Sequence, residues 1–504
     1  MISFTMAEVE VPVWSILVPL LLTFLYMYST WTYNTFKKLG IPGPKPWPLL
    51  GNAEVIRGFD KFCWKLKLHY GNVVGVYFGR KPVIVLHDRK IIKRVLIKDF
   101  DSFTDRAHFA SFINFVPPLE KALLGLKGTM WKKVRRLMTP AFSSGKLRQM
   151  MPQVNARADI LVENLAQLTE TPIELLNHAS AFSLDVISRV AFGLETNAQE
   201  NLNDAVYINV RNLSHIRLIQ FIMTFLMGDL VTFLRIRFGI RLFLGKTMDF
   251  FTRLTSHLVE GRHANQQGTK DFFQLLLDAH RKQKNGGYET DETGVTFSNS
   301  ELTAHTVQFY LGGTDTTGKT LTFLCHSLAF NPEVQNRLIK DIDNVIGDSK
   351  DVTSDMCAQI PYLRQCICET LRLYPPFRAL VRECTRTIDM EGIHFPAGVT
   401  VRIPIAVLHM DPDCWQEPQK FRPERFSPEE QATHDPAMWL PFGIGPRNCI
   451  GMRLAMMEVE IAAVKLLQMF RILPCAGSEE EIQLRDMIVT EPAKPVLLQV
   501  QKRC

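Results

Sequence analysis

The chain has 504 residues, of which 46% are hydrophobic and 22% are charged, so it holds ample material for a large core and cannot be mainly disordered. Its formal charge of +7 is mild and no long run of like charges occurs, which gives nucleic-acid binding little support. The ten cysteines lack the spacing of a zinc ribbon or a small secreted scaffold and favour a reducing compartment. The one close pair, Cys366 and Cys368, is interpreted as packing rather than as a metal site.

The first segment is apolar. Residues 11–36 contain no charged side chain, and the stretch from Trp14 to Tyr33 could cross ~30 Å of hydrocarbon as a helix. Acidic residues precede the stretch and Lys37 and Lys38 follow it, which places the main body in the cytosol. The alternative is a cleaved secretory signal, but its leading region is acidic and no small-residue cleavage site follows. We therefore predict a retained membrane anchor over residues 1–36.

A proline-rich segment follows the anchor. Residues 41–48 read IPGPKPWP, and their four prolines forbid helix continuation and make a stiff spacer. We predict a hinge over residues 37–48 and one large domain over 49–504.

The body is expected to be mostly helical. Residues 73–88 carry two β-rich runs around a Gly-Arg-Lys-Pro turn, which predicts a hairpin, and further extended segments are expected within 386–407. The clearest helix opens with the capping-box pattern Ser298-Asn-Ser-Glu301 and runs without proline to Asn331-Pro332. Residues 212–251 are rich in Phe, Leu, Ile and Met with interspersed arginines. They fit either ordinary core helices or a substrate-access lid that touches the membrane surface.

The strongest local signal is the segment PFGIGPRNCIG at 441–451. Its fixed positions follow F-x-x-G-x-R-x-C-x-G, with Phe442, Arg447 and Cys449 as the side chains of chemical interest. A glycine-bearing loop of this kind brings a thiolate to a helix start, where N–H groups and the helix dipole stabilise the sulfur. Phe442 would shield the sulfur from water, and Arg447 would neutralise a haem propionate.

Two further patterns outweigh the ordinary reading of Cys449 as a packing residue. Glu369 and Arg372 lie one helical turn apart and can pair, and Arg425 could complete a buried Glu-Arg-Arg network that fixes the cysteine loop. Trp131 and Arg135 lie four residues apart on one helical face, so they can reach the same haem propionate; the alternative is a basic surface helix.

The segment Leu311-Gly-Gly-Thr-Asp-Thr-Thr317 lies midway along the long predicted helix. Two glycines inside a helix cost about 1 kcal/mol each against alanine, so another advantage must favour them, such as close approach of a ligand. The hydroxyl of Thr316 can bond to the carbonyl four residues earlier and open the helix locally. Asp315 either caps or pairs structurally or relays protons together with Thr316, and the surrounding glycines and threonines favour the relay.

These motifs occur in the order of one known family. Residues 41–504 resemble a cytochrome P450. The motifs that carry the resemblance are, in chain order, the proline hinge, W-x-x-x-R, [AG]-G-x-[DE]-T-[TS], E-x-x-R, P-E-R-F and the cysteine loop. The amino-acid sequence at 103–106, 140–146 and 442–451 is most similar to the animal microsomal branch of this family. That branch includes the drug- and steroid-oxidising subfamily three A and thromboxane synthase.

The resemblance implies a mainly α fold with small β-sheets, preceded by a transmembrane helix. It implies haem b with Cys449 as the axial thiolate, Arg382 as an additional propionate ligand, and Asp315 and Thr316 as the catalytic proton relay. It also implies an NADPH-dependent flavoprotein reductase, with cytochrome b5 as a candidate second donor, and a single-pass anchor in the endoplasmic reticulum membrane. Substrate contacts are expected from the segments 104–126, 208–223, 377–379 and 488–489 and from Gln308, Phe309, Leu311 and Gly312.

Two departures from the family pattern concern the predicted substrate site and relay. Gln308 is polar where close relatives are apolar, and Lys319 adds a charge after the threonines, so a relative's substrate does not transfer safely. The implied activity is insertion of one oxygen atom into a lipophilic substrate. The alternatives are an isomerase or lyase that rearranges a lipid endoperoxide, which would need no proton relay, and a non-catalytic haem sensor.

Overall fold

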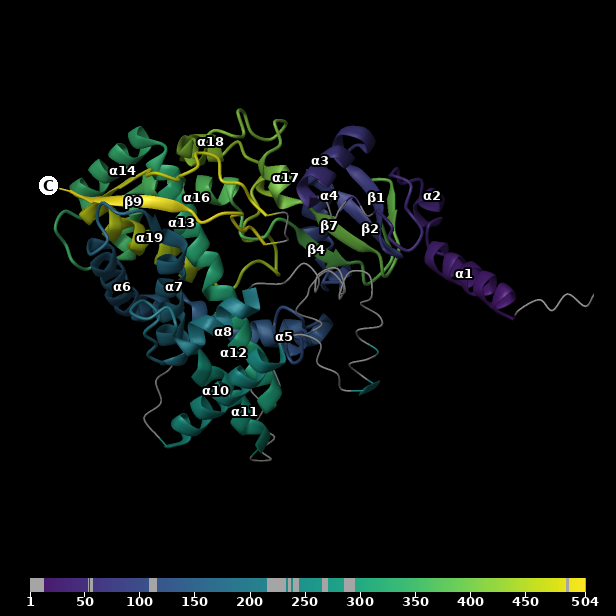
Figure 1. Cartoon of the computed structure of the whole chain (residues 1–504), viewed down its shortest axis with the longest axis horizontal. Coiled ribbons are helices and arrows are strands. Elements are labelled where there is room, and N and C mark those ends of the chain that lie inside the picture. The colour runs from purple at the N-terminus through teal and green to yellow at the C-terminus, as the bar shows by residue number, and fades with distance from the viewer. Residues whose placement is uncertain are drawn as a thin grey trace, which may run out of the picture.

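The computed structural model describes residues 13–52, 54, 58–107, 116–214, 233, 237–238, 244–264, 271–284, 295–485 and 489–503. Within these ranges the chain is mainly helical with small sheets, as predicted (Figure 1). The helices are α1 (Trp14–Thr30), α2 (Thr35–Leu39), α3 (Phe59–Tyr70), α4 (Arg89–Lys93), α5 (Gly128–Met138), α6 (Ser144–Ala166), α7 (Leu175–Phe192), α8 (Ala205–Ser214), α10 (Gly245–Ala264), α11 (Phe272–Lys284), α12 (Asn299–Gly313), α13 (Asp315–Ala329), α14 (Pro332–Val345), α15 (Ser354–Ala358), α16 (Pro361–Leu373), α17 (Ile405–His409), α18 (Pro428–Gln431) and α19 (Met452–Met469).

The main sheet has the strand order β1-β2-β7-β4, in which only β2 and β7 are parallel. The predicted hairpin is confirmed: β1 and β2 pair antiparallel and Gly79 and Arg80 make the turn. The remaining sheets have the orders β3-β9-β8 and β5-β6. The strands are β1 (Val73–Phe78), β2 (Lys81–Leu86), β3 (Ile173–Glu174), β4 (Leu380–Glu383), β5 (Ile388–Met390), β6 (Ile393–Phe395), β7 (Thr400–Ile403), β8 (Phe470–Leu473) and β9 (Leu497–Lys502).

The region 386–407 contains extended segments, as the sequence predicts. It contains β5, β6 and β7, but the chain turns helical at Ile405, directly after Pro404, because proline fits the start of a helix. Strand β4, which precedes this region, was not predicted; it is short and lacks alternating polarity.

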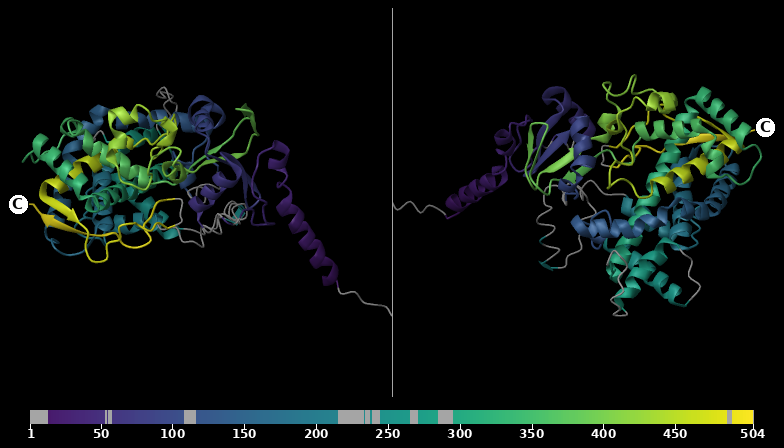
Figure 2. Two further views of the ribbon diagram at one scale, coloured as in Figure 1. Left: turned by 90° about the horizontal axis from the view of Figure 1, so that it is seen from above. Right: turned by 180° about the vertical axis from the view of Figure 1, so that it is seen from behind.

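The helix α1 extends away from the body (Figures 1 and 2), and most of its side chains are exposed. It belongs to the one described helical segment, Trp14–Leu39, that is long and apolar enough to cross a membrane. Phe36, the last residue of the predicted anchor, has a buried ring that packs on Gly75 and Tyr77. Residues 41–46, within the predicted hinge, continue without helix or strand.

The long predicted helix is in fact two helices. The capping box at Ser298 and Glu301 is present, but α12 ends at Gly313 and α13 begins at Asp315. The break has a local cause: the Thr316 hydroxyl donates to the Gly312 carbonyl at 2.7 Å, and the Ser183 hydroxyl donates to the Gly313 carbonyl at 2.7 Å. Two consecutive carbonyls thus bind side-chain hydroxyls at the point where the helical pattern stops.

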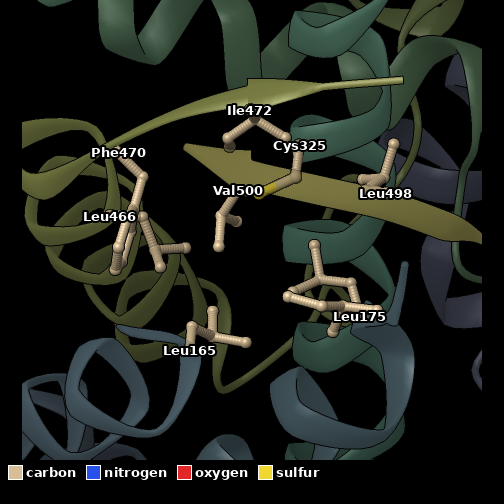
Figure 3. Close-up of a pocket in the computed structure, with 9 residues that line it drawn as sticks. Leu165, Leu175, Cys325, Leu466, Phe470, Ile472, Leu498 and Val500 are labelled. Carbon is tan, nitrogen blue, oxygen red and sulfur yellow. The ribbon is translucent and has the colours of Figure 1, made fainter. Parts of the chain in front are cut away.

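Helix α13 lies inside the helical part of the molecule, against α7, α16 and α19 (Figure 1). Beside it a cavity of about 10 Å³ is lined by Leu165, Leu175, Cys325 and residues of β8, β9 and α19 (Figure 3). Its lining is apolar and it is no larger than one water molecule, so it is a packing void rather than a ligand site.

The predicted lid falls mostly outside the described residues. Of 212–251, the structure describes the end of α8, the start of α10 and a few residues between them, among which Phe233 and Phe238 are exposed. The choice between core helices and a lid therefore stays a prediction.

Candidate functional site

Cys449 lies in the loop that leads into α19, three residues before the helix begins. The Cys449 amide donates to the Phe442 carbonyl at 2.8 Å, which closes the loop. Gly445 has a φ of +75°, and a Cβ there would lie 1.9 Å from the Leu96 carbonyl oxygen, so the loop needs glycine at this position. The motif thus works as predicted, by bringing a thiol to a helix start.

The Cys449 side chain is solvent-accessible, yet the surrounding protein raises the pKa of its thiol. The N–H groups of Gly451 and Met452 and the guanidinium groups of Arg135 and Arg106 act in the opposite direction and favour the thiolate. A thiol that is both accessible and flanked by cationic groups is suited to bind a metal as its anion.

Four arginines converge beside this loop. Arg106 lies in the predicted substrate segment 104–126, Arg135 on α5, Arg382 on β4 and Arg447 in the cysteine loop. Burial, with a smaller contribution from neighbouring arginines, lowers the pKa of Arg106 to about 10 and that of Arg447 to about 9. Burial, together with Arg106 and Arg447, holds the pKa of Arg382 well below its usual range. Among the described residues, no ion pair joins any of the four to a carboxylate.

Such a cluster fits a bound dianion. The Nε and Nη2 atoms of Arg382 and the Nε and Nη1 atoms of Arg447 are buried without hydrogen-bond partners. Buried guanidinium N–H groups are costly unless an acceptor meets them, and carboxylates are their strongest partners. The residues present therefore fit haem, whose two propionates would meet these donors while Cys449 meets the iron.

Trp131 and Arg135 both lie at this site but make different contacts. The Trp131 ring is buried, and the Arg447 guanidinium carbon lies 4.3 Å from its centroid. Arg135 donates from Nη1 to the Asn448 carbonyl and from Nη2 to the Asn448 Oδ1, each at 2.9 Å. In this structure Arg135 therefore holds the cysteine loop, and Trp131 orients Arg447.

Arg106 falls in the predicted substrate segment 104–126, but its place in the arginine cluster was missed because a single arginine in a loop carries no spacing signal. A backbone hydrogen bond positions Arg106 at the site: the Glu383 amide donates to the Asp105 carbonyl at 2.8 Å. Arg106 therefore lies beside β4, the strand that carries Arg382. Arg106 also donates to the Leu124 carbonyl at 3.3 Å.

The Glu-Arg-Arg network is present and buried. Arg372 contacts both carboxylate oxygens of Glu369 at 2.7 and 2.8 Å, and Arg425 contacts Oε1 at 3.2 Å. Sequence reasoning missed its link to the cysteine loop, which is His409. Its Nδ1 lies 3.0 Å from the Arg372 carbonyl, and its Nε2 accepts from the Leu440 amide at 2.8 Å. Burial and Arg372 lower the pKa of His409 to about 3, so it stays neutral and can accept.

At the helix break, Asp315 and Thr316 start α13. Both are partly exposed, and the hydroxyl of Thr316 points back to the Gly312 carbonyl. The two glycines differ in role. A Cβ at Gly312 would meet no neighbouring atom within 4 Å, whereas one at Gly313 would lie 2.9 Å from the side chain of Ile187 on α7. Of the two glycines, only Gly312 therefore has open space where a side chain would begin.

The second hydroxyl at the break belongs to a buried chain. Ser183 lies 2.7 Å from the Gly313 carbonyl and 3.1 Å from the Glu458 Oε2 atom. One hydroxyl proton cannot serve two acceptors, so a protonated Glu458 that donates to Ser183 completes the chain. In agreement, burial raises the pKa of the Glu458 carboxyl to about 8.

Part of the predicted substrate site is also assembled. Gln308 on α12 accepts from the Leu124 amide at 2.9 Å, so its carbonyl group is bound to the loop rather than free for a ligand. Phe377 and Val489 form an isolated β-bridge, which joins two of the predicted contact segments. Residues 108–115, 215–223 and 488 lie outside the described residues.

Three features lie together here: a cysteine loop at a helix start, buried guanidinium groups without carboxylate partners in the described part of the chain, and a broken helix with an acid and a hydroxyl. Together they define a site of the haem-thiolate type. The sequence profile described as "Cytochrome P450" matches residues 41–500. The chain is 36% identical over 488 residues to cytochrome P450 3A29 of Sus scrofa, with 96% of this chain and 95% of the relative covered. It is 37% identical over 493 residues to cytochrome P450 3A13 of Mus musculus, with coverage of 96% and 95%. It is 34% identical over 497 residues to lithocholate 6-beta-hydroxylase of Mesocricetus auratus, with coverage of 97% and 96%.

The chain therefore belongs to the cytochrome P450 family. It is a haem-thiolate monooxygenase, and the predicted resemblance to subfamily three A is confirmed. The cofactor of this family is haem with a cysteine thiolate on the iron.

Proposed function

We propose that Cys449 is the iron ligand and that the enzyme inserts one oxygen atom from dioxygen into a lipophilic substrate such as a steroid, a fatty acid or a xenobiotic. The observation that carries the proposal is the Cys449 loop at the start of α19 with buried, unpartnered guanidinium nitrogens of Arg382 and Arg447 beside it. Haem, when bound, supplies an iron centre at which dioxygen is activated with electrons from a reductase.

The residues of the chain divide the remaining tasks. Arg382, Arg447 and Arg106 bind the propionates, Trp131 orients Arg447, and Arg135 fixes the cysteine loop through Asn448. Phe442 lies in the same loop and covers the sulfur side. Each of these contacts positions the cofactor without taking part in proton transfer.

Asp315 and Thr316 hold and move the protons. The Thr316 hydroxyl is held by the Gly312 carbonyl, so its oxygen has a fixed place beside the open face of Gly312. Asp315 directly precedes Thr316 in the chain, and its side chain is 18% exposed, so a proton from solvent can reach its carboxylate. A rearrangement enzyme needs no such pair, which favours the monooxygenase over an isomerase or lyase.

The membrane and the redox partner complete the proposal. We propose that α1 is a single-pass anchor in the endoplasmic reticulum membrane, with Lys37 and Lys38 and the catalytic domain on the cytosolic side. Electrons would come from NADPH through a flavoprotein reductase, with cytochrome b5 as a candidate second donor. The cations of the exposed face of α5, Lys132 and Lys133, are suited to an acidic donor surface.

The test is a reconstitution of the full chain with a microsomal flavoprotein reductase, NADPH and a panel of lipophilic compounds. We expect NADPH-dependent products that carry one oxygen atom from isotopically labelled dioxygen. Products formed from endoperoxides without NADPH, and none with it, would contradict the monooxygenase and support the isomerase. The relative named for 6-beta-hydroxylation of lithocholate makes that compound a sensible member of the panel.

A further inference from the structure

Lys319 is a buried cation beside the proposed relay. It lies on α13, one turn after Asp315, and only 7% of the residue is exposed. The helix is held close to α7 at this level, because a Cβ at Gly318 would lie 2.7 Å from Ser180. A lysine is seldom buried unless a carboxylate compensates the lost hydration of its ammonium group.

The compensating carboxylate is that of Asp315. Within the described part of the chain, the ion pair recorded for Lys319 joins its Nζ to the Asp315 Oδ2 atom at 3.7 Å. The two side chains are 9% and 18% exposed, so solvent screens the pair weakly. An acid four residues before a base is also the favoured order on a helix.

The pair lies in the first turns of α13, directly after the helix break. Thr316 follows Asp315 directly and is fixed by the Gly312 carbonyl. Asp315 also acts on Tyr207 of α8, whose pKa is raised to about 12 mainly by burial, with Arg211 acting against the rise and Asp315 adding to it. Asp315 thus has a cation one turn along its own helix and a hydroxyl next to it in the sequence.

We propose that Lys319 is a positioning residue of the relay: its ammonium group holds the Asp315 carboxylate in one orientation beside Thr316. The proposal rests on the proposed function, since it assigns a task to Lys319 only if Asp315 relays protons. In the proposal, Lys319 makes no contact of its own with substrate or haem. It acts through Asp315, and this dependence is what an experiment can isolate.

The experiment is a double-mutant cycle on the full-length holoenzyme with Lys319→Met, Asp315→Asn and the double variant. Methionine keeps the length and packing of the lysine stem and removes the charge. We expect the haem spectrum and substrate dissociation constant of Lys319→Met to stay unchanged while product per NADPH falls about threefold, less than a fully lost relay would cost. In the double variant, Lys319→Met should cause no loss beyond that of Asp315→Asn.

Lys465 offers a matched control. It is also a buried lysine with an acidic partner, Asp159, but it lies on α19 away from the helix break. Lys465→Met should change thermal stability and leave product per NADPH unchanged. Lys319→Arg, which keeps the charge, should restore most of the coupling; if Lys319→Met fails to incorporate haem, Lys319→Gln takes its place in the cycle.

The outcomes separate the two proposals. Unchanged coupling in Asp315→Asn would overturn the relay itself, and the role of Lys319 with it. Uncoupling in Asp315→Asn but not in Lys319→Met would overturn the role of Lys319 alone. Losses that multiply in the double variant, or a Lys319→Arg variant no better than Lys319→Met, would show that the lysine is only structural.

Discussion

The groups around the Cys449 sulfur determine whether it is a thiol or a thiolate. The surrounding protein raises the pKa of its thiol, although the residue is accessible to solvent. Two backbone N–H groups and two guanidinium groups act in the opposite direction and favour the thiolate. A neutral ligand such as imidazole would leave these donors and cations without the charge that they compensate.

We predict that Cys449→His abolishes the long-wavelength absorption band of the reduced carbon-monoxide complex, because that band requires a thiolate on the iron. The measurement is a reduced carbon-monoxide difference spectrum of the purified variant. As a control, Cys475→Ser changes a partly exposed cysteine outside the site and should keep the band. A Cys449→His protein that retains the band would remove Cys449 from the proposal.

Thr316 is the second residue whose change has a specific signature. We predict that Thr316→Ala keeps haem and substrate binding, while product per NADPH falls about tenfold and peroxide rises, since general acid–base groups contribute 10²–10⁴-fold when fully lost. The measurement is the ratio of product and of peroxide to NADPH consumed. Thr320→Ala, which loses a similar hydroxyl one turn further along α13, is the control. Equal coupling in wild type and Thr316→Ala would contradict the relay.

At the scale of the element, the features fixed by short stretches of sequence were predicted well. The hairpin of β1 and β2, the capping box of α12 and the Glu369–Arg372 pair each depend on residues within a few positions, and all are present. The Cys366 and Cys368 pair is buried, as packing requires.

Features that depend on distant segments were not predicted. The break at Thr314 needs Ser183 from α7 as well as Thr316, and periodicity along one helix cannot show a partner on another. His409 joins the network to the cysteine loop through two backbone groups, and Arg106 reaches the site through a bridge to β4. None of these leaves a spacing pattern.

The buried chain at the break makes stability depend on pH. The Glu458 carboxyl has a pKa near 8 when folded and 4.5 as its ordinary value, so the folded state holds a proton that the unfolded state releases. Its contribution is full below about pH 4.5 and is lost as pH rises through 8, by at most about 1.4 kcal/mol per pH unit.

We predict that Glu458→Gln removes this contribution, because an amide can still donate to Ser183 but does not titrate. The measurement is the thermal denaturation midpoint of the holoenzyme from pH 5 to pH 9, taken as the difference between wild type and variant so that other groups cancel. The difference should shrink or reverse as pH rises. Parallel curves for the two proteins would show that Glu458 is not protonated in the fold.

At the scale of the whole molecule, the exposed α1 and the buried Phe36 divide the N-terminal region. Sequence alone placed the boundary after residue 36 because residues 11–36 carry no charge, but Phe36 fills the space above Gly75. Hydropathy does not distinguish a side chain facing lipid from one facing a protein core.

We predict that deletion of residues 1–30 weakens membrane binding and keeps haem incorporation and stability, whereas deletion of residues 1–36 also destabilises the body. Loss of a buried phenylalanine costs about 3–5 kcal/mol. Membrane flotation and thermal denaturation of both truncations are the measurements, with Phe36→Ala in the full chain as the matched control. Equal stability of the two truncations would mean that Phe36 contributes nothing to the body.

The projection of α1 from the body also bears on how the enzyme meets its substrate. A lipophilic compound partitions into the bilayer, where its local concentration can greatly exceed its concentration in water. An enzyme anchored in the bilayer binds the compound from this lipid phase. Saturation of the enzyme should then depend on the ratio of substrate to lipid. Adding empty vesicles at constant total substrate would lower this ratio, and the rate of the anchored enzyme would fall with it.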